Sequence, residues 1–245
     1  MFRNLTPTVR NLILVNVSIF IGSGIFPQEY LSIHYFQAKD FHVFQFITYM
    51  FVHGSFLHLL SNMFGLYMFG SLLERIWGAQ RFLFFYFFCG VGAGLLYMGI
   101  QHFIDFADIR RATELVLSNP NSFNMMDYMQ HYSAISPPAD GGNIEWVRAN
   151  YQEYIGRNIV AGASGSIFGI IMAFGYLFPN SELFIFPFPI PIKAKYLVSF
   201  YGLYEMYQGI QQQTGDNVAH FAHIGGMIFA VILLKIWGTK RNNFY

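Results

Sequence analysis

Charged residues are scarce in this chain of 245 residues: Asp, Glu, Lys and Arg together make up 11% of it, whereas hydrophobic residues make up 54%. A soluble domain typically carries about 25% charged residues, so the composition argues against a protein surrounded only by water. Cysteine is nearly absent too, and the single Cys89 excludes an internal disulfide. No repeat at a spacing of roughly 20–50 residues is present, so we expect a single domain over residues 1–245.

The scarcity of charge leaves long uncharged segments, which predict membrane-spanning helices. A helix needs about 20 predominantly apolar residues to cross a bilayer. Five segments come close to this requirement, and a sixth is shorter and contains Glu205. The expected spans are residues 11–27, 50–72, 82–101, 159–178, 196–211 and 218–237. The sequence therefore predicts an all-α polytopic membrane protein with a bundle of six transmembrane helices.

The basic residues predict how these helices are oriented. Six spans put both termini on one side of the membrane, and most Lys and Arg residues fall on that side. Cytoplasmic loops carry an excess of Lys and Arg. We therefore expect a multi-pass protein of the plasma (cell inner) membrane with both termini in the cytoplasm.

Two connections between the expected spans stand out. Residues 101–156 are expected to form an extracytoplasmic insertion, in which "DFADIRRATELVLSN" and "IEWVRANYQEYI" are typical of helices and "SPPADGGN" of a turn. Trp146 and the tyrosines of the second segment suit a membrane interface. The other connection, "FPNSELFIFPFPIPIKAKY", contains prolines that exclude a regular helix, so we expect a hydrophobic turn on the membrane surface.

Polar side chains gather in three of the expected spans. Such groups are costly at membrane depth and mark function by default. They occur in "YMFVHGSFLHLLSNMFG", "VAGASGSIFG" and "NVAHFAHIGGMIFA", and they are His53, His58, Asn62, Ser164, Ser166, His220 and His223. Counting about 1.5 Å per residue along a helix puts both Ser164 and His223 roughly 8 Å inside their spans. Matching depth would let a histidine accept the proton of a nucleophilic serine.

The remaining polar residues have positions of their own around the helices. His58 and Asn62 are four residues apart and share a helix face, where two donors could stabilise an oxyanion. His53 lies five residues before His58, about 140° around a helix, so we expect it to serve a different contact. Ser166 lies about 200° around the helix from Ser164 and is expected to be a packing serine.

Less specific interpretations stay open beside these. Buried histidines are often structural, and Gly162, Ala163 and Gly165 suit close helix packing. Glu205 is expected to be structural or to act in gating. A set of four histidines, His53, His58, His220 and His223, could instead bind a metal. Against such a metalloprotein, there is no H-E-x-x-H motif and no Asp or Glu within the three polar spans.

Taken together, these motifs resemble those of the rhomboid intramembrane serine proteases. "GASGSIFG" is similar to the family's G-x-S-G motif, and "AHFAHIGG" is similar to its last-helix histidine motif. "FVHGSFLHLLSNMFGLYMFG" and the following "LERIWGAQRFLFFYF" resemble its second helix and the turn after it. The resemblance covers about residues 44–100 and 159–235.

The resemblance implies roles for individual residues. Ser164 would be the nucleophile and His223 the general base, in a dyad without a third carboxylate. His58 and Asn62 would form the oxyanion hole with the Ser164 amide. The supporting residues would be His53, His220 and Phe168, which replaces a tyrosine found in some members.

The same resemblance implies a function. It is cleavage of transmembrane protein substrates near the extracytoplasmic membrane face, through an acyl-enzyme, with no cofactor and no metal. The implied partners are those substrates and the lipid bilayer, and nucleic acid is not among them. The fifth helix and the loop before the sixth would act as a lateral gate and a cap. The alternative within the family is an inactive rhomboid-like protein that binds clients without cutting them.

Overall fold

The computed structural model describes residues 5–23, 25, 27–137, 142–185, 188–211 and 219–238, and this part is mostly helical. The α-helices are α1 (Pro7–Gly22), α2 (Gln28–Leu31), α3 (Gln45–Thr48), α4 (Phe56–Gly65), α5 (Ser71–Trp77), α6 (Ala79–Ile100), α7 (Ala107–Ser118), α8 (Ser122–Tyr132), α9 (Ile144–Gly156), α10 (Ser164–Leu177), α11 (Ala194–Gln211) and α12 (His220–Ile236). A 3₁₀ turn, η2 (Tyr49–Phe51), follows α3, and π-helical turns η3 (Leu66–Gly70) and η4 (Gln101–Asp105) extend α4 and α6.

Two continuous helical segments in the described part are long and apolar enough to cross a membrane. They are Phe56–Trp77, which joins α4, η3 and α5, and Ala79–Asp105, which joins α6 and η4. Helices α1, α10 and α12 are apolar as well but shorter. The expected count of six spans therefore stays a prediction, and the last expected span begins at residue 218, outside the described residues.

Two expected helix starts are wrong. The helix expected from residue 50 begins at Phe56, because Ser55 has extended backbone geometry and its side chain caps the His58 amide at 3.2 Å. The helix expected from residue 159 begins at Ser164. The chain before it is extended, since Val160 pairs with Ile33 in an isolated β-bridge.

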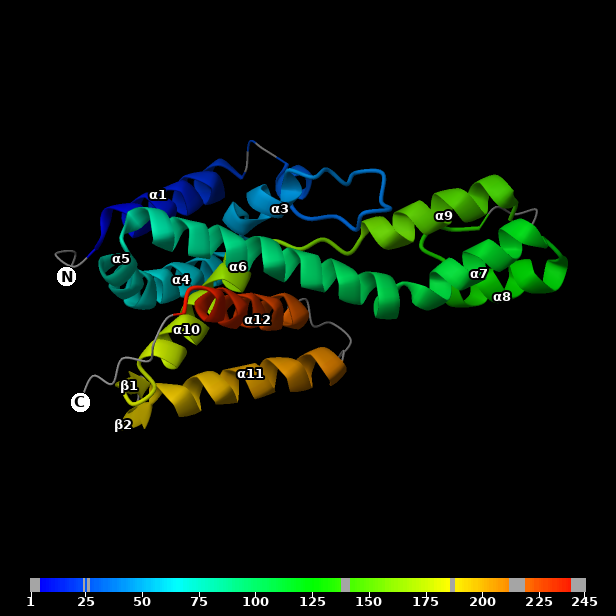
Figure 1. The fold of residues 1–245 in the computed structure, drawn as a ribbon. Coiled ribbons are helices and arrows are strands. Elements are labelled where there is room, and N and C mark those ends of the chain that lie inside the picture. The colour runs from blue at the N-terminus through cyan, green and yellow to red at the C-terminus, as the bar shows by residue number, and fades with distance from the viewer. Residues whose placement is uncertain are drawn as a thin grey trace.

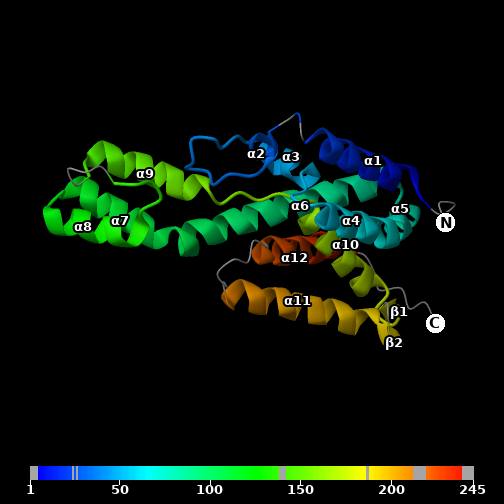
Figure 2. The same ribbon diagram turned by 180° about the vertical axis from the view of Figure 1, so that it is seen from behind.

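The proline-rich connection, expected to be a hydrophobic turn, forms an antiparallel hairpin, so the all-α class is correct only for the helical part of the chain. Strand β1 (Glu182–Ile185) pairs with β2 (Phe188–Lys193), with Glu182 opposite Lys193 and Leu183 opposite Ile192. Proline is tolerated there because both strands of a two-stranded sheet are edge strands. The hairpin leads directly into α11, the outermost helix beside α12 (Figures 1 and 2).

Helices α6, α10 and α12 form the centre of the bundle, and glycines let them approach closely (Figure 1). A Cβ atom added to Gly226 of α12 would lie 1.9 Å from the Gly165 carbonyl oxygen of α10. One added to Gly165 would lie 2.5 Å from the Ala93 side chain of α6. Such backbone contact is typical of membrane helix crossings built on small residues. It fixes the N-terminal ends of α10 and α12 next to each other.

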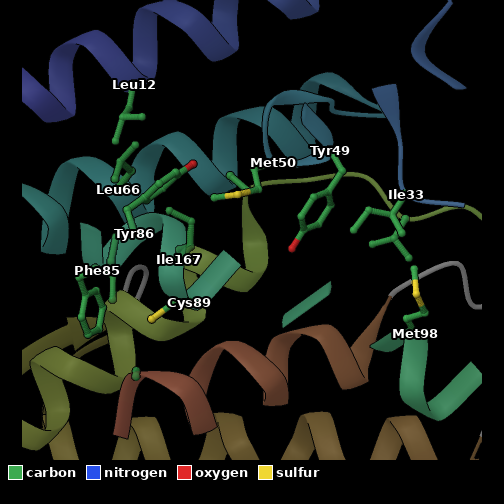
Figure 3. Close-up of a cluster of buried hydrophobic side chains, with 14 of the residues drawn as sticks. Leu12, Ile33, Tyr49, Met50, Leu66, Phe85, Tyr86, Cys89, Met98 and Ile167 are labelled. Carbon is green, nitrogen blue, oxygen red and sulfur yellow. The ribbon is translucent and has the colours of Figure 1, made fainter. Parts of the chain in front are cut away.

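A core of large apolar side chains fills the space between α1, α6 and α10. Figure 3 shows Leu12 of α1 above Tyr86 and Cys89 of α6, with Ile167 of α10 beside them. A polar side chain of α10 is accommodated in this core by a backbone carbonyl. The Ser166 hydroxyl donates to the Tyr86 carbonyl at 2.7 Å, which agrees with the packing role expected for this serine.

Glu74, in the first turn of α5, caps the N-terminus of α1. Its buried carboxylate accepts hydrogen bonds from the amides of Thr8 and Val9 at 3.0 and 2.9 Å, and from the hydroxyl of Thr6. A carboxylate at this position satisfies free amides and complements the helix dipole. These hydrogen bonds hold the N-terminus of α1 against α5.

The insertion between α6 and α10 is a helical unit at one end of the molecule (Figures 1 and 2), and its buried apolar residues are continuous with the main core. The two helices expected in it are confirmed as α7 and α9, whereas α8 was not predicted. The expected turn lies partly in residues 138–141, outside the described residues. Trp146 does not face the membrane interface, because it is buried and donates to the Ser136 carbonyl at 3.1 Å.

The side chain of Asn150 links α9 to α8 and to the segment that follows α8. Buried Asn150 of α9 accepts from the amides of Ala134 and Ile135 at 2.6 and 3.1 Å. Its amide group donates to the Tyr128 hydroxyl at 3.2 Å and to the Tyr132 carbonyl at 2.8 Å. Because a buried amide is costly unless it is paired, this network fixes how α8 packs on α9.

Candidate active site

Ser164 is the first residue of α10 and follows a tightly specified turn. The Gly162 amide donates to the Tyr49 carbonyl at 2.9 Å, and Gly162 has φ +133°, a conformation that favours glycine. A Cβ atom at Gly162 would also lie 2.8 Å from the His58 ring. The segment before Ser164 is therefore extended chain and not helix, and this extended segment places Ser164 inside the bundle. At the start of a helix, the first backbone amides have no intrahelical acceptor.

The side chains of Ser164 and His223 meet across the α10–α12 crossing. His223 Nε2 lies 2.8 Å from Ser164 Oγ, within hydrogen-bonding distance. The Phe168 ring, one turn after Ser164, stacks on the imidazole with centroids 4.2 Å apart and an angle of 6° between the planes. Because the imidazole is stacked on one face and bonded at its edge, its orientation is fixed.

A carboxylate reaches the other edge of this imidazole. Glu205 Oε2, from α11, lies 2.8 Å from His223 Nδ1 and 2.6 Å from His220 Nδ1. All three residues are buried, with relative exposures of 6% for Glu205 and 8% for each histidine. The expectation of a histidine without a carboxylate partner is therefore wrong. A signal was present in the sequence, because Glu205 is the only acidic residue of α11.

His58 and Asn62 line the same polar cavity as Ser164 and His223, which has a volume of about 760 Å³. Asn62 lines the cavity, and its buried Nδ2 atom has no hydrogen-bond partner among the described residues. The further lining residues are Ser55, Leu57, Ser61, Tyr97, Arg157, Asn158, Ile159, Val160, Ala161, Phe168 and Ala219. Several of these are polar, so the cavity can admit water.

His53 packs against His58, contrary to the expectation that it serves a separate contact. The two rings are 5.0 Å apart in an edge-to-face arrangement. The helical angle used to separate them does not apply, because the chain between Val52 and Ser55 is not helical. Both ring nitrogens of His53 are buried without a hydrogen-bond partner in the described part of the chain. His53 is therefore a direct neighbour of His58 and contacts it through the ring.

The four histidines expected as an alternative metal site divide into two groups. His53 and His58 form one pair, while His220 and His223 meet at Glu205. Glu205, His220 and His223 are the group among the described residues whose donor atoms could hold a metal ion. Their contacts of 2.6 and 2.8 Å to a single carboxylate oxygen are those of hydrogen bonds.

Helix α11 borders this site and presents a largely apolar outer face. Phe200, Leu203 and Tyr207 are exposed on it, and Tyr201 makes an edge-to-face contact with Phe168. Helix α11 corresponds to the fifth expected span, for which the family resemblance implies a role as a lateral gate. The expected cap, residues 212–218, lies outside the described residues.

Comparison with known proteins identifies the family. The rhomboid domain model matches residues 40–106 and 138–239, so α7 and α8 fall between the matched segments. The chain is 26% identical over 232 residues to RHOMBOID-like protein 12, mitochondrial, of Arabidopsis thaliana, covering 91% of this chain and 56% of that protein. It is 35% identical over 85 residues to Rhomboid-like protein 11, chloroplastic, of the same plant, covering 35% of this chain and 30% of that protein.

A third relative is an uncharacterised mitochondrial rhomboid protein of Schizosaccharomyces pombe, 26% identical over 266 residues, covering 95% of this chain and 64% of that protein. The chain thus spans less than two thirds of the length of each of these relatives. The expected plasma-membrane location with cytoplasmic termini is wrong, because the two relatives matched along most of the chain are mitochondrial. The matched domain covers most of the sequence, and the chain belongs to the rhomboid family.

Proposed function

We propose that this chain is an intramembrane serine endopeptidase that cleaves transmembrane protein substrates. The observation that carries the proposal is the hydrogen bond of 2.8 Å between Ser164 Oγ and His223 Nε2 beside a polar cavity. A serine is a weak nucleophile until an adjacent base accepts its proton. Family membership favours proteolysis over other acyl-transfer reactions.

In the proposed reaction, Ser164 Oγ attacks the carbonyl carbon of the scissile peptide bond while His223 Nε2 accepts its proton. The same imidazole then gives this proton to the leaving amine, which leaves an acyl-enzyme. Water activated by His223 hydrolyses the ester and regenerates the serine. The cavity would supply that water at the position of the dyad.

The proposed oxyanion hole consists of three donors. Asn62 and His58 line the same cavity, Asn62 Nδ2 has no partner among the described residues, and the Ser164 amide lies at the start of α10. Preorganised donors of this kind stabilise the developing negative charge of a tetrahedral intermediate. The fixed turn at Gly162, packed against His58, would keep these donors in place.

The six-helix topology is part of the proposal. Phe56–Trp77 and Ala79–Asp105 would be spans, and α1, α10, α11 and α12 would complete the bundle. The position of α11 at the outside of the bundle (Figure 2) suits entry of a substrate helix from the lipid. From the two mitochondrial relatives, we propose a mitochondrial membrane as the location.

Cleavage of a reporter transmembrane protein tests this function. The purified full chain in proteoliposomes should cut the reporter, and S164A should not, because the nucleophile is gone. S166A is the matched control, since the Ser166 hydroxyl points to the Tyr86 carbonyl and not to His223. Retained cleavage by S164A would refute the proposed function.

A further inference from the structure

We infer that Glu205 completes a hydrogen-bonded chain Glu205–His223–Ser164 and acts as a positioning residue for the general base. The inference rests on the proposed function and adds a carboxylate to the expected serine–histidine pair. The three side chains come from α11, α12 and α10. The chain of contacts is continuous, with 2.8 Å from Oε2 to Nδ1 and 2.8 Å from Nε2 to Oγ.

The first consequence concerns which nitrogen of His223 carries the proton. A neutral imidazole has one N–H donor and one acceptor nitrogen. The Glu205 carboxylate accepts hydrogen bonds, so His223 Nδ1 is the donor. Nε2 is then the acceptor that faces the Ser164 hydroxyl, which is the tautomer a general base requires.

The second consequence concerns charge during the reaction. His223 becomes an imidazolium when it takes the proton of Ser164, and a buried cation is costly unless it is paired. The carboxylate of Glu205 is buried at the other ring edge, where a negative charge stabilises the imidazolium. The transition state gains this stabilisation to a greater extent than the resting enzyme, so the effect should appear in kcat.

His220 holds the carboxylate in place for this role. Its Nδ1 lies 2.6 Å from the same Oε2 atom that contacts His223. Two donors on one oxygen restrain the rotation of the Glu205 side chain, which α11 carries into the α11–α12 contact. The supporting role of His220 is therefore to fix Glu205 and not to touch Ser164.

The test uses the purified full chain in proteoliposomes with three substitutions of Glu205. E205Q should lower kcat for the reporter by up to about 10⁴-fold, the loss typical of a carboxylate-to-amide change behind a serine–histidine pair, with little change in KM. E205D should retain more activity than E205Q because it keeps the negative charge. Formate should restore part of the activity of E205A by occupying the vacated carboxylate position. E182Q, which removes an exposed carboxylate from β1, is the matched control.

A double-mutant comparison separates positioning from a structural role. If Glu205 acts through His223, then E205Q should not slow the residual fluorophosphonate labelling of Ser164 in an H223A background. An equal slowing in both backgrounds would overturn the inference, as would E205Q cleaving within about twofold of wild type. Inhibition of wild type by a chelator would assign the cluster to a metal and also overturn it. A wild-type chain that neither labels nor cleaves would count against the proposed function instead.

Discussion

His223 Nε2 lies 2.8 Å from Ser164 Oγ, although the two residues are 59 positions apart in the sequence. The contact depends on the α10–α12 crossing, where Gly226 and Gly165 bring two backbones together. The chemistry proposed for the pair therefore depends on helix packing as directly as on the two side chains themselves.

Replacing His223 should be far more damaging than replacing His220. H223A removes the proposed base and should abolish reporter cleavage, whereas H220A should leave measurable activity, because His220 contacts Glu205 and not Ser164. Initial rates of reporter cleavage at saturating substrate would check this. Equal loss in the two variants, with both still folded by size-exclusion chromatography, would contradict the assignment of the base.

Asn62 offers a test of the oxyanion hole. N62A should lower kcat about 100-fold, since loss of one oxyanion donor typically costs this much, and should leave KM nearly unchanged. The matched control is S61A, because Ser61 lines the same cavity but donates to the His58 carbonyl at 3.0 Å. A rise in KM without a fall in kcat would instead make Asn62 a substrate-binding residue.

The helix crossing itself can be tested at a glycine. G226A should destabilise the fold by about 3 kcal/mol, the upper end for overpacking, because the new Cβ would lie 1.9 Å from a backbone oxygen that cannot move aside easily. G99A is the control, since a Cβ at Gly99 of α6 would meet nothing within 4 Å. Thermal unfolding in detergent should show a large loss for G226A alone. Similar melting temperatures would contradict the close backbone contact.

The cap on the first helix gives a test away from the cavity. E74A should lower the free energy of unfolding by about 1–2 kcal/mol, the usual cost of losing a helix cap, since the amides of Thr8 and Val9 would lose their acceptor. E114A removes an exposed carboxylate on α7 and serves as control. Denaturant unfolding in micelles would measure both, and equal values would show that the cap contributes nothing.

The sequence predicted the apolar helices and the proximity of Ser164 to His223, because long uncharged segments and polar residues within them are local features. The depth of Ser164 had been estimated by counting helical residues from residue 159, and that basis was wrong. Extended chain through Val160 replaces a helical turn there, and nothing in the composition of that segment distinguishes the two.

The charge of Glu205 marked it in the sequence, but its contact with His223 could not be predicted. Which face of α11 turns toward α12 depends on packing between helices, and α11 has apolar side chains on several faces. The hairpin at β1 and β2 was missed because its prolines exclude a helix without specifying strand pairing. Helix α8 was overlooked although it carries a periodic apolar face, formed by buried Tyr128 and the partly buried Met125, Met129 and Tyr132.

The most direct measurement of the central claim is the site of covalent labelling by a fluorophosphonate. The probe phosphonylates a serine only when an adjacent base activates it, so mass spectrometry of the labelled wild-type chain should place one adduct on Ser164. H223A should label far more slowly, and S164A should not label at all. An adduct on another serine, or equal labelling of S164A, would contradict the account.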